Sequence, residues 1–427
     1  MRKFLLLIFL LPALFSSITV ISTEKDFVLD EEEKYHFTST TYGRYYDSIP
    51  TNPNAYEETP TFTDSTLSKT AGKLVPDQPI QITGFYVNEE GVPIFKLKNS
   101  QFVIADKNTI YEDTVQSIED VHQEMWLKPG FILYDKANIN GAKKINTTLA
   151  PYTKVNIVQI VQTVKGTYGQ IEGQGWVSME FLDETDNRID KVQEILSSKY
   201  NKADYSIYVK QLDTGKEAGI NQDQEMYSAS VTKLPYLYYV QEQLDQKKLS
   251  LDQKFKYIGA VNDFAGAYEP EGSGSIAKSA DDKEYSVQDL INRVAKESDN
   301  VAHNILGYYA TNQSDKNFQQ TINKIAGKKW DVEERQASSR MAGNVLEAIY
   351  EQNGMIIDAL SQTNYDNQRI SKNIDAKVAH KIGDAYDFKH DAAIVYADSP
   401  FIIVIFTNNS NYDNISQIAD DVYGVLK

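Results

Sequence analysis

Short runs in which apolar and polar residues alternate fill the stretch 77–184 of this 427-residue chain. The clearest run is 155–161, and Gly residues and Asn-Gly pairs separate it from its neighbours. Alternation with period two, bounded by turn residues, predicts β-strands. Because two stretches of similar sequence occur within this region, we expect two small all-β modules, at 77–127 and 128–184.

From residue 185 onward the spacing becomes that of a mixed α+β domain. Apolar Ile189, Val192 and Leu196 recur at helical intervals. Later runs predict strands at 205–212, 392–396 and 401–406, and a last helix at 412–426. Strands near both ends of the region, with helices between them, indicate one antiparallel sheet that both ends enter and that helices flank.

The residues before the first module lack this periodicity. The stretch 23–76 is rich in Thr, Ser, Tyr, Pro and Glu, which predicts an acidic disordered linker. Residues 1–22 begin Met-Arg-Lys and continue as an apolar run, the pattern of a signal peptide or an N-terminal anchor. We therefore expect an extracellular, cell-surface or membrane-anchored protein, with cleavage and retention of the segment both open.

Composition removes several classes of chemistry. The chain has 43 basic and 60 acidic side chains, a formal charge of -17, which argues against nucleic acid as a partner. It has no cysteine, which excludes disulfides, thiolate nucleophiles and thiolate metal sites. Its five histidines show no metal-binding spacing, so we expect neither a metal nor a cofactor.

Three short motifs carry the candidate chemistry. They are Ser230-Val231-Thr232-Lys233, Ser298-Asp299-Asn300 and Lys381-Ile382-Gly383, in that order along the chain. The first motif begins a predicted helix, where side chains three residues apart share one face. A serine hydroxyl is a weak nucleophile until a base takes its proton, and a lysine is that base only if burial or nearby positive charge lowers its pKa.

The order S-x-x-K, S-D-N, K-x-G resembles that of the class A β-lactamases and penicillin-binding serine enzymes. The surrounding sequence is similar as well, at 249–253, 271–274 and 285–291. The resemblance covers the chain from about residue 185 to the end. It implies a β-lactamase/transpeptidase-like α+β domain over 185–427, an antiparallel sheet flanked by helices.

The resemblance also implies roles for four catalytic residues. Ser230 would be the acylated nucleophile, and Lys233 would accept its proton. Ser298 would pass the proton to the leaving nitrogen. Lys381 would supply positive charge to the substrate carboxylate and help to keep Lys233 neutral.

Three further residues would bind substrate. Asn300 would hydrogen-bond the substrate amide, and the N–H groups of Ser230 and Asp384 would form an oxyanion hole. Gly383 would lack a side chain so that substrate can lie along its strand. Adjacent His380 points to the opposite face of that strand, so we expect a structural role for it.

Two departures from the family pattern bear on function. Ile382 stands where the family has a threonine, so a hydroxyl that holds the substrate carboxylate is missing. The E-x-x-L-N motif, whose Glu activates the deacylating water, is absent between Asn300 and His380. The nearest carboxylates include Glu333 and Glu334, which we interpret as surface charge, and we expect slow deacylation.

The stretch 175–182 resembles the end of small SH3-like, GW-type wall modules of Gram-positive surface proteins, and 101–106 is similar to it. This resemblance implies wall polymer as a partner of both modules and a Gram-positive-like cell surface. The alternative interpretation is a generic β domain in which Trp176 is a core residue.

Three hypotheses follow. The first is an exported serine hydrolase, of β-lactamase or D,D-peptidase type, that forms an acyl-enzyme on Ser230 with a β-lactam or a peptidoglycan stem peptide. The second is a catalytically impaired scaffolding protein that binds cell wall and keeps the fold. An esterase that uses the same serine and lysine is the third.

Overall fold

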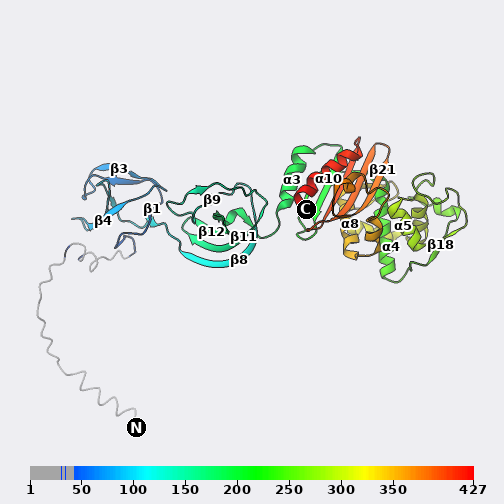
Figure 1. The fold of residues 1–427 in the computed structure, drawn as a ribbon, viewed down its shortest axis with the longest axis horizontal. Coiled ribbons are helices and arrows are strands. Elements are labelled where there is room, and N and C mark those ends of the chain that lie inside the picture. Colours follow the sequence, from blue (N-terminus) through cyan, green and yellow to red (C-terminus); the bar gives the residue numbers. More distant parts are fainter. Residues whose placement is uncertain (1–29, 31–33, 35–42) are drawn as a thin grey trace, which may run out of the picture. The chain divides into compact units, whose positions relative to one another are not determined.

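The computed structural model describes residues 30, 34 and 43–427 (Figure 1). By its internal contacts the chain divides into two compact units. One comprises the described residues up to His122 with 132–147 and 157–179, and the other comprises the remainder. The predicted signal peptide or anchor at 1–22 lies outside the described residues. Within the described part of the chain, no helix has the length and apolar character needed to cross a membrane.

A five-stranded sheet forms the first β region. Its strands are β2 (Thr59–Phe62), β3 (Thr70–Leu74), β4 (Ile82–Val87), β5 (Pro93–Leu97) and β6 (Phe102–Ile104), in the order β3-β2-β6-β5-β4. A separate pair joins β1 (Pro53–Ala55) to β7 (Ile110–Glu112). The core beneath the sheet centres on Phe95, Val103 and Ile110, which are fully buried.

The predicted linker over 23–76 is therefore wrong in its last part, because β1, β2 and β3 lie within it. In β2 the buried positions are Thr59 and Thr61, and exposed Pro60 lies between them. The alternation exists, but threonine rather than an aliphatic residue occupies the inward positions. A pattern search that counts apolar residues does not detect such a strand.

A seven-stranded sheet follows, in the order β10-β9-β13-β12-β11-β8-β14. Its strands are β8 (Ser117–Leu127), β9 (Leu133–Tyr134), β10 (Lys144–Ile145), β11 (Lys154–Thr163), β12 (Gly166–Ile171), β13 (Trp176–Ser178) and β14 (Leu182–Asp183), with the short helix η1 (Met179–Phe181) before the last. Strand β8 pairs with β14, Leu127 opposite Leu182. The predicted boundary at 127/128 is thus wrong, since β8 belongs to the second sheet. The all-β character is as predicted, and the SH3-like resemblance remains a prediction.

The C-terminal region has the predicted α+β architecture (Figure 1). Its antiparallel sheet has the order β16-β15-β23-β22-β21, with β15 (Tyr205–Gln211), β16 (Glu217–Ile220), β21 (Lys377–Ala385), β22 (Phe388–Tyr396) and β23 (Phe401–Asn408). Strands from both ends of the region meet in it, because β15 pairs with β23. Helices α3 (Arg188–Lys199) and α10 (Tyr412–Leu426) cover one face, and α8 (Ser339–Gln352) covers the other.

Strand β23 shows why the sheet holds two cores. Ile403 and Ile405 pack into the cluster with α3 and α10, whereas Ile402 and Val404 pack into the larger cluster with the other helices. All four are fully buried. A strand covered on both faces is continuously apolar rather than alternating, as its sequence is.

The remaining elements form the helical part beside the sheet. They are β17 (Glu225–Tyr227), η2 (Ala229–Thr232), α4 (Lys233–Asp245), β18 (Lys254–Lys256), η3 (Gly259–Asn262), β19 (Glu284–Ser286), α5 (Val287–Lys296), α6 (Asn300–Tyr309), α7 (Lys316–Ala326), β20 (Gln336–Ser338), α9 (Met355–Leu360) and η4 (Arg369–Asn373). Three segments carry the residues of the site: the turn η2, the connection between α5 and α6, and the edge strand β21.

Candidate active site

Ser230 lies in the turn η2, immediately before helix α4. Ala229 before it has a φ of 48°, a left-handed conformation that turns the chain sharply. Ser228 fixes the entry to this turn, because its N–H and its hydroxyl both donate to the Arg335 carbonyl, at 2.7 and 2.8 Å. Ser230 is half-buried whereas Val231 is fully buried, so the turn leaves the serine partly accessible to solvent.

Lys233 begins helix α4 and is fully buried. Its Nζ lies 2.7 Å from both the Ser298 carbonyl oxygen and Asn300 Oδ1, and 3.3 Å from Ser298 Oγ. A neutral amine has two N–H donors and one lone pair. The two short bonds use the donors, and the longer contact leaves the lone pair facing the Ser298 hydroxyl. No hydrogen bond joins Lys233 to the Ser230 hydroxyl in the described structure, and such contacts often tighten only when substrate binds.

Ser298 connects the two lysines of the site. It lies between α5 and α6, is fully buried, and has a φ of 55°, a strained conformation for a residue with a side chain. Lys381 Nζ donates to Ser298 Oγ at 2.8 Å and to the Ile382 carbonyl at 3.0 Å. The hydroxyl of Ser298 therefore lies between the amines of Lys233 and Lys381.

Both amines have pKa values below the ordinary range of lysine. Burial, and then the charge of Lys381, hold the pKa of Lys233 well below its usual value. Burial lowers the pKa of Lys381 to about 7; Arg369 adds to this effect, and Asp391 opposes it. Removal from water disfavours the charged form of an amine. The site thus holds two lysines that lose a proton more readily than ordinary lysines do.

Asn300 lies within the site, with both ends of its amide occupied. Its Oδ1 accepts from Lys233, and its Nδ2 donates to the Glu269 carbonyl at 2.9 Å. A Cβ on Gly272 would collide with Nδ2, so that glycine lets the Glu269 loop approach. Binding of a substrate amide by Asn300 remains a prediction; the second N–H of Nδ2 and the second lone pair of Oδ1 would serve it.

Gly383 lies in β21 against the nucleophile turn. A Cβ there would come within 2.8 Å of the Ser228 carbonyl oxygen and 3.1 Å of Val231 Cγ2. The glycine therefore lets the strand contact the turn, which is a different reason from the predicted need for room along the strand. Asp384 follows at the open edge of the sheet, where alternate backbone groups have no partner strand.

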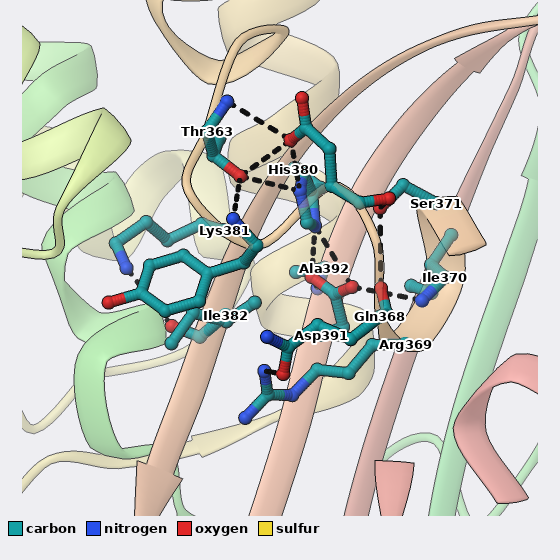
Figure 2. A network of polar contacts seen from close by, with 12 residues as sticks. Thr363, Gln368, Arg369, Ile370, Ser371, His380, Lys381, Ile382, Asp391 and Ala392 are labelled. Atoms are coloured by element: carbon teal, nitrogen blue, oxygen red, sulfur yellow. Dashed lines mark hydrogen bonds and ion pairs between the residues drawn. The ribbon is translucent and has the colours of Figure 1, made fainter. Parts of the chain in front are cut away.

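His380 lies on the opposite face of β21 from Lys381, as predicted (Figure 2). Its Nδ1 is 3.0 Å from both oxygens of Asp391, and its Nε2 is 3.1 Å from Asp366 Oδ1 and 2.9 Å from Thr363 Oγ1. Burial lowers the pKa of His380, but Asp391 and Asp366 outweigh it and raise that pKa to about 9. The imidazolium links the strand to the segment before it.

The segment 327–335, between α7 and β20, contains the two glutamates that the sequence analysis considered beside the absent E-x-x-L-N motif. Glu333 and Glu334 are exposed, as interpreted from the sequence. The side chain that extends from this segment toward the site is Arg335. Its Nη2 donates to the carbonyls of Gly266 and Ala267, at 3.2 and 2.9 Å.

Tyr268 was not found from the sequence, and it links several parts of the site. Its hydroxyl donates to the Ala229 carbonyl at 2.8 Å. Lys233 Nζ and Arg335 Cζ lie 4.3 and 4.0 Å from its ring centroid. Asn304 of α6 bonds both its N–H and its carbonyl. No motif or period marks Tyr268 or Arg335, because only the folded chain brings them to the site.

Metal-binding clusters were the other kind of site to consider. In the described ranges, no group of three or more His, Asp or Glu side chains is arranged to hold a metal ion. The chemistry that the site offers is that of hydroxyls, amines and backbone N–H groups.

A half-buried serine in the turn before a helix, a buried lysine three residues on, and a second hydroxyl between two lysines form a site in which buried amines lie beside hydroxyl groups. The sheet with helices on both faces supplies its frame. The chain belongs to the Beta-lactamase enzyme family, whose model matches residues 187–426, more than half of the chain. A search of the curated proteins finds no match.

Solved structures similar to the chain include PBP-A, at 17% identity and a TM-score of 0.47, covering 56% of this chain and 96% of that one. A β-lactamase from Chitinophaga pinensis is 21% identical with a TM-score of 0.44, covering 56% and 100%. A β-lactamase from Sphaerobacter thermophilus is 16% identical with a TM-score of 0.45, covering 56% and 94%.

Proposed function

We propose that this protein is an exported serine hydrolase that forms an acyl-enzyme on Ser230, with a β-lactam or the D-alanyl part of a peptidoglycan stem peptide as acyl donor. The observation that carries the proposal is the Ser298 hydroxyl, 3.3 and 2.8 Å from the amines of Lys233 and Lys381. Burying two amines this close together disfavours their charged forms and lowers their pKa values. An amine with a lowered pKa accepts and releases a proton more readily during catalysis.

The arrangement supports one sequence of proton transfers. Ser230 Oγ attacks the carbonyl carbon of the donor while neutral Lys233 takes the hydroxyl proton. Ser298 gives its own proton to the leaving nitrogen and regains one from Lys233. The carbon–nitrogen bond breaks, and the acyl group stays on Ser230. Backbone N–H groups of Ser230 and Asp384 stabilise the oxyanion.

Deacylation is proposed to be slow. Hydrolysis of the ester needs a base within hydrogen-bond reach of a water, directly or through one further water. The segment 327–335 brings the Arg335 guanidinium toward the site, and its carboxylates, Glu333 and Glu334, are exposed. A guanidinium is always protonated and cannot accept that proton. The acyl-enzyme is then expected to persist.

Labelling with a fluorescent penicillin tests the proposal. Wild type should carry a fluorescent band that survives denaturation, and Ser230→Ala should not. Ser250→Ala, which changes an exposed loop serine, is the matched control and should label like wild type. Equal labelling of Ser230→Ala, or no labelling of wild type even at high concentration, would overturn the assignment.

The second candidate is a catalytically impaired scaffolding protein whose β modules bind wall polymer. Ile382 and the Arg335 segment favour it, because each replaces a group that the family uses. Comparing nitrocefin hydrolysis, D-alanine release and p-nitrophenyl ester turnover separates β-lactamase, peptidase and esterase activities from this candidate, which predicts none of them.

A further inference from the structure

The peptide group between Ala229 and Ser230 supplies one donor of the proposed oxyanion hole, because its N–H is that of Ser230. Ser230 is the second residue of η2, and the first N–H groups of a helical turn have no acceptor within the turn. The same peptide group contributes the Ala229 carbonyl. A trans peptide is planar and its C=O and N–H point in opposite directions, so a contact that holds the carbonyl oxygen also sets the direction of the N–H.

The side chain that holds this carbonyl is Tyr268. Its hydroxyl donates to the Ala229 oxygen at 2.8 Å, and the two residues are 8% and 3% exposed. Burial raises the pKa of the Tyr268 hydroxyl, so it keeps its proton and remains a donor at neutral pH. A hydrogen bond to a carbonyl also polarises the amide and strengthens the N–H at its other end as a donor.

The nucleophile turn depends on contacts from other segments. Ala229 has a φ of 48°, a conformation that costs free energy for a residue with a side chain. The Tyr227 carbonyl accepts from His390 Nε2 at 2.8 Å. The Ser228 hydroxyl donates to the Arg335 carbonyl at 2.8 Å. Together with the tyrosine hydroxyl on the next residue, these bonds hold three consecutive residues immediately before the nucleophile.

Helix α6 in turn fixes Tyr268. Asn304 Oδ1 accepts from the Tyr268 N–H at 2.8 Å, and Asn304 Nδ2 donates to its carbonyl at 2.7 Å. Asn304 is fully buried. The Tyr268 ring packs edge-on against His303 of the same helix, with 4.8 Å between the ring centroids. Both the backbone and the ring are held, so the hydroxyl has a defined position, as a group that orients another group requires.

We propose that Tyr268 is a positioning residue for acylation: its hydrogen bond to the Ala229 carbonyl directs the Ser230 N–H at the oxyanion that forms when Ser230 attacks the acyl donor. The inference rests on the proposed acyl transfer at Ser230. Tyr268 acts here through the peptide group and not on the substrate. This role is separate from the contact of its ring with Lys233 Nζ, 4.3 Å from the ring centroid.

Tyr268→Phe tests the proposal, because it removes the hydroxyl and keeps the ring beside Lys233. Stopped-flow acylation of the full chain by penicillin separates the constant for noncovalent binding from the rate of the acylation step. We expect the acylation step to slow about tenfold, less than the 10²-fold or more that loss of an oxyanion donor causes, because the donor is misdirected and not removed. The binding constant should stay as in wild type, since the oxyanion forms only in the transition state.

Tyr236→Phe is the matched control. Tyr236 is 1% exposed and also packs against His303, but its hydroxyl bonds Ser314 Oγ at 2.6 Å. The change removes an equally buried hydroxyl from the same aromatic cluster and should leave the acylation step as in wild type. A fall of the same size in both variants would show that packing of the cluster, and not the bond to Ala229, governs the rate, and would overturn the proposal.

The ester carbonyl of the acyl-enzyme gives a second readout. With 13C in the β-lactam carbonyl of penicillin, isotope-difference infrared spectra isolate this carbonyl on Ser230. Hydrogen bonds from an oxyanion hole lower its stretching frequency, so wild type should give one low-frequency band. In Tyr268→Phe the band should shift upward or split, because the Ser230 N–H no longer has one direction. The wild-type spectrum tests the proposal even if Tyr268→Phe does not fold.

Three results would overturn the inference alone. They are an acylation step in folded Tyr268→Phe as fast as in wild type, slower labelling that weaker binding explains, and a wild-type band at the frequency of the ester without hydrogen bonds. In each of these results Ser230 is still acylated, so the proposed function stands. No acylation of wild type by penicillin or by a D-alanyl thioester would overturn the proposed function and this inference together.

Discussion

The two faces of strand β21 shift the pKa of a buried basic side chain in opposite directions. His380 and Lys381 are neighbours, and both are almost completely buried, yet the pKa of His380 is raised to about 9 and that of Lys381 is lowered to about 7. His380 has the carboxylates of Asp391 and Asp366 within 3.1 Å. The direct partners of Lys381 are a hydroxyl and a carbonyl, both neutral.

Burial alone lowers the pKa of a cation, and a carboxylate in contact reverses the direction. One face of the strand therefore holds a stable charge that fastens the sheet to the segment before it. The other face keeps an amine poised to exchange a proton. Three substitutions and one pH series test this difference between the two faces.

Lys381→Met should have the largest effect on the rate of acylation. It removes the amine that donates to Ser298 Oγ, and we expect the acylation rate to fall about 10³-fold, in the range of one lost proton-handling group. Stability should fall less than in His380→Gln. The measurement is acylation by a D-alanyl thioester together with a denaturant melt.

The control for this change is Lys254→Met, which alters an exposed lysine in β18 and should acylate like wild type. An acylation rate in Lys381→Met within tenfold of the wild-type rate would break the distinction between the two faces.

His380→Gln should have the largest effect on stability. Removing one member of a buried ion pair leaves Asp391 uncompensated, which costs about 3 kcal/mol or more of unfolding free energy. The acylation rate of the folded fraction should change much less than in Lys381→Met. A stable variant that has lost acylation would show that His380 acts on the chemistry instead.

The stabilisation by His380 should depend on pH with a defined sign. A pKa raised in the folded state contributes stability that is complete below the unfolded value, about 6.5, and that fades as pH rises through about 9. The difference in unfolding free energy between wild type and His380→Gln should therefore shrink over this window.

Comparing the two proteins at each pH cancels the opposite contribution of Lys233 and Lys381, whose lowered pKa values make the wild type gain stability as pH rises. The exposed His122 supplies the control for loss of a histidine, since His122→Gln should cost much less unfolding free energy than His380→Gln. A difference for His380→Gln that does not vary with pH would contradict the raised pKa.

Gly383→Ala should have the smallest effect. The added Cβ would meet the Ser228 carbonyl at 2.8 Å, so turn and strand must separate, which costs about 1–3 kcal/mol and slows acylation. Gly424→Ala in α10 meets nothing within 4 Å and should be neutral or stabilising. Equal stability of the two variants, measured by thermal melts, would show that the contact at Gly383 yields readily.

The sequence predicted the sheet and the last helix of the C-terminal domain because their hydrophobic patterns are local and strong. The run 401–406 is continuously apolar, and the helix over 412–426 has clear periodicity, with bounds that match α10. The S-x-x-K, S-D-N and K-x-G motifs also meet in space, since Lys233, Ser298 and Lys381 are joined by hydrogen bonds.

The rest depended on contacts between distant segments. Tyr268 and Arg335 reach the site from segments that carry no motif, and a single arginine or tyrosine in a loop is indistinguishable from a surface residue. The strands at 53–74 were missed because Thr59 and Thr61 take inward positions that usually hold aliphatic residues. In each case the folded neighbours, not the local sequence, decide the role.

Acylation of Ser230 is the central prediction, and time-resolved mass spectrometry of the intact protein tests it most directly. After exposure to penicillin or a D-alanyl thioester, the wild type should gain the mass of one acyl group. Peptide mapping should place that group on Ser230, and it should remain after the free donor is removed. No adduct, or one that also forms on Ser230→Ala, would contradict the account.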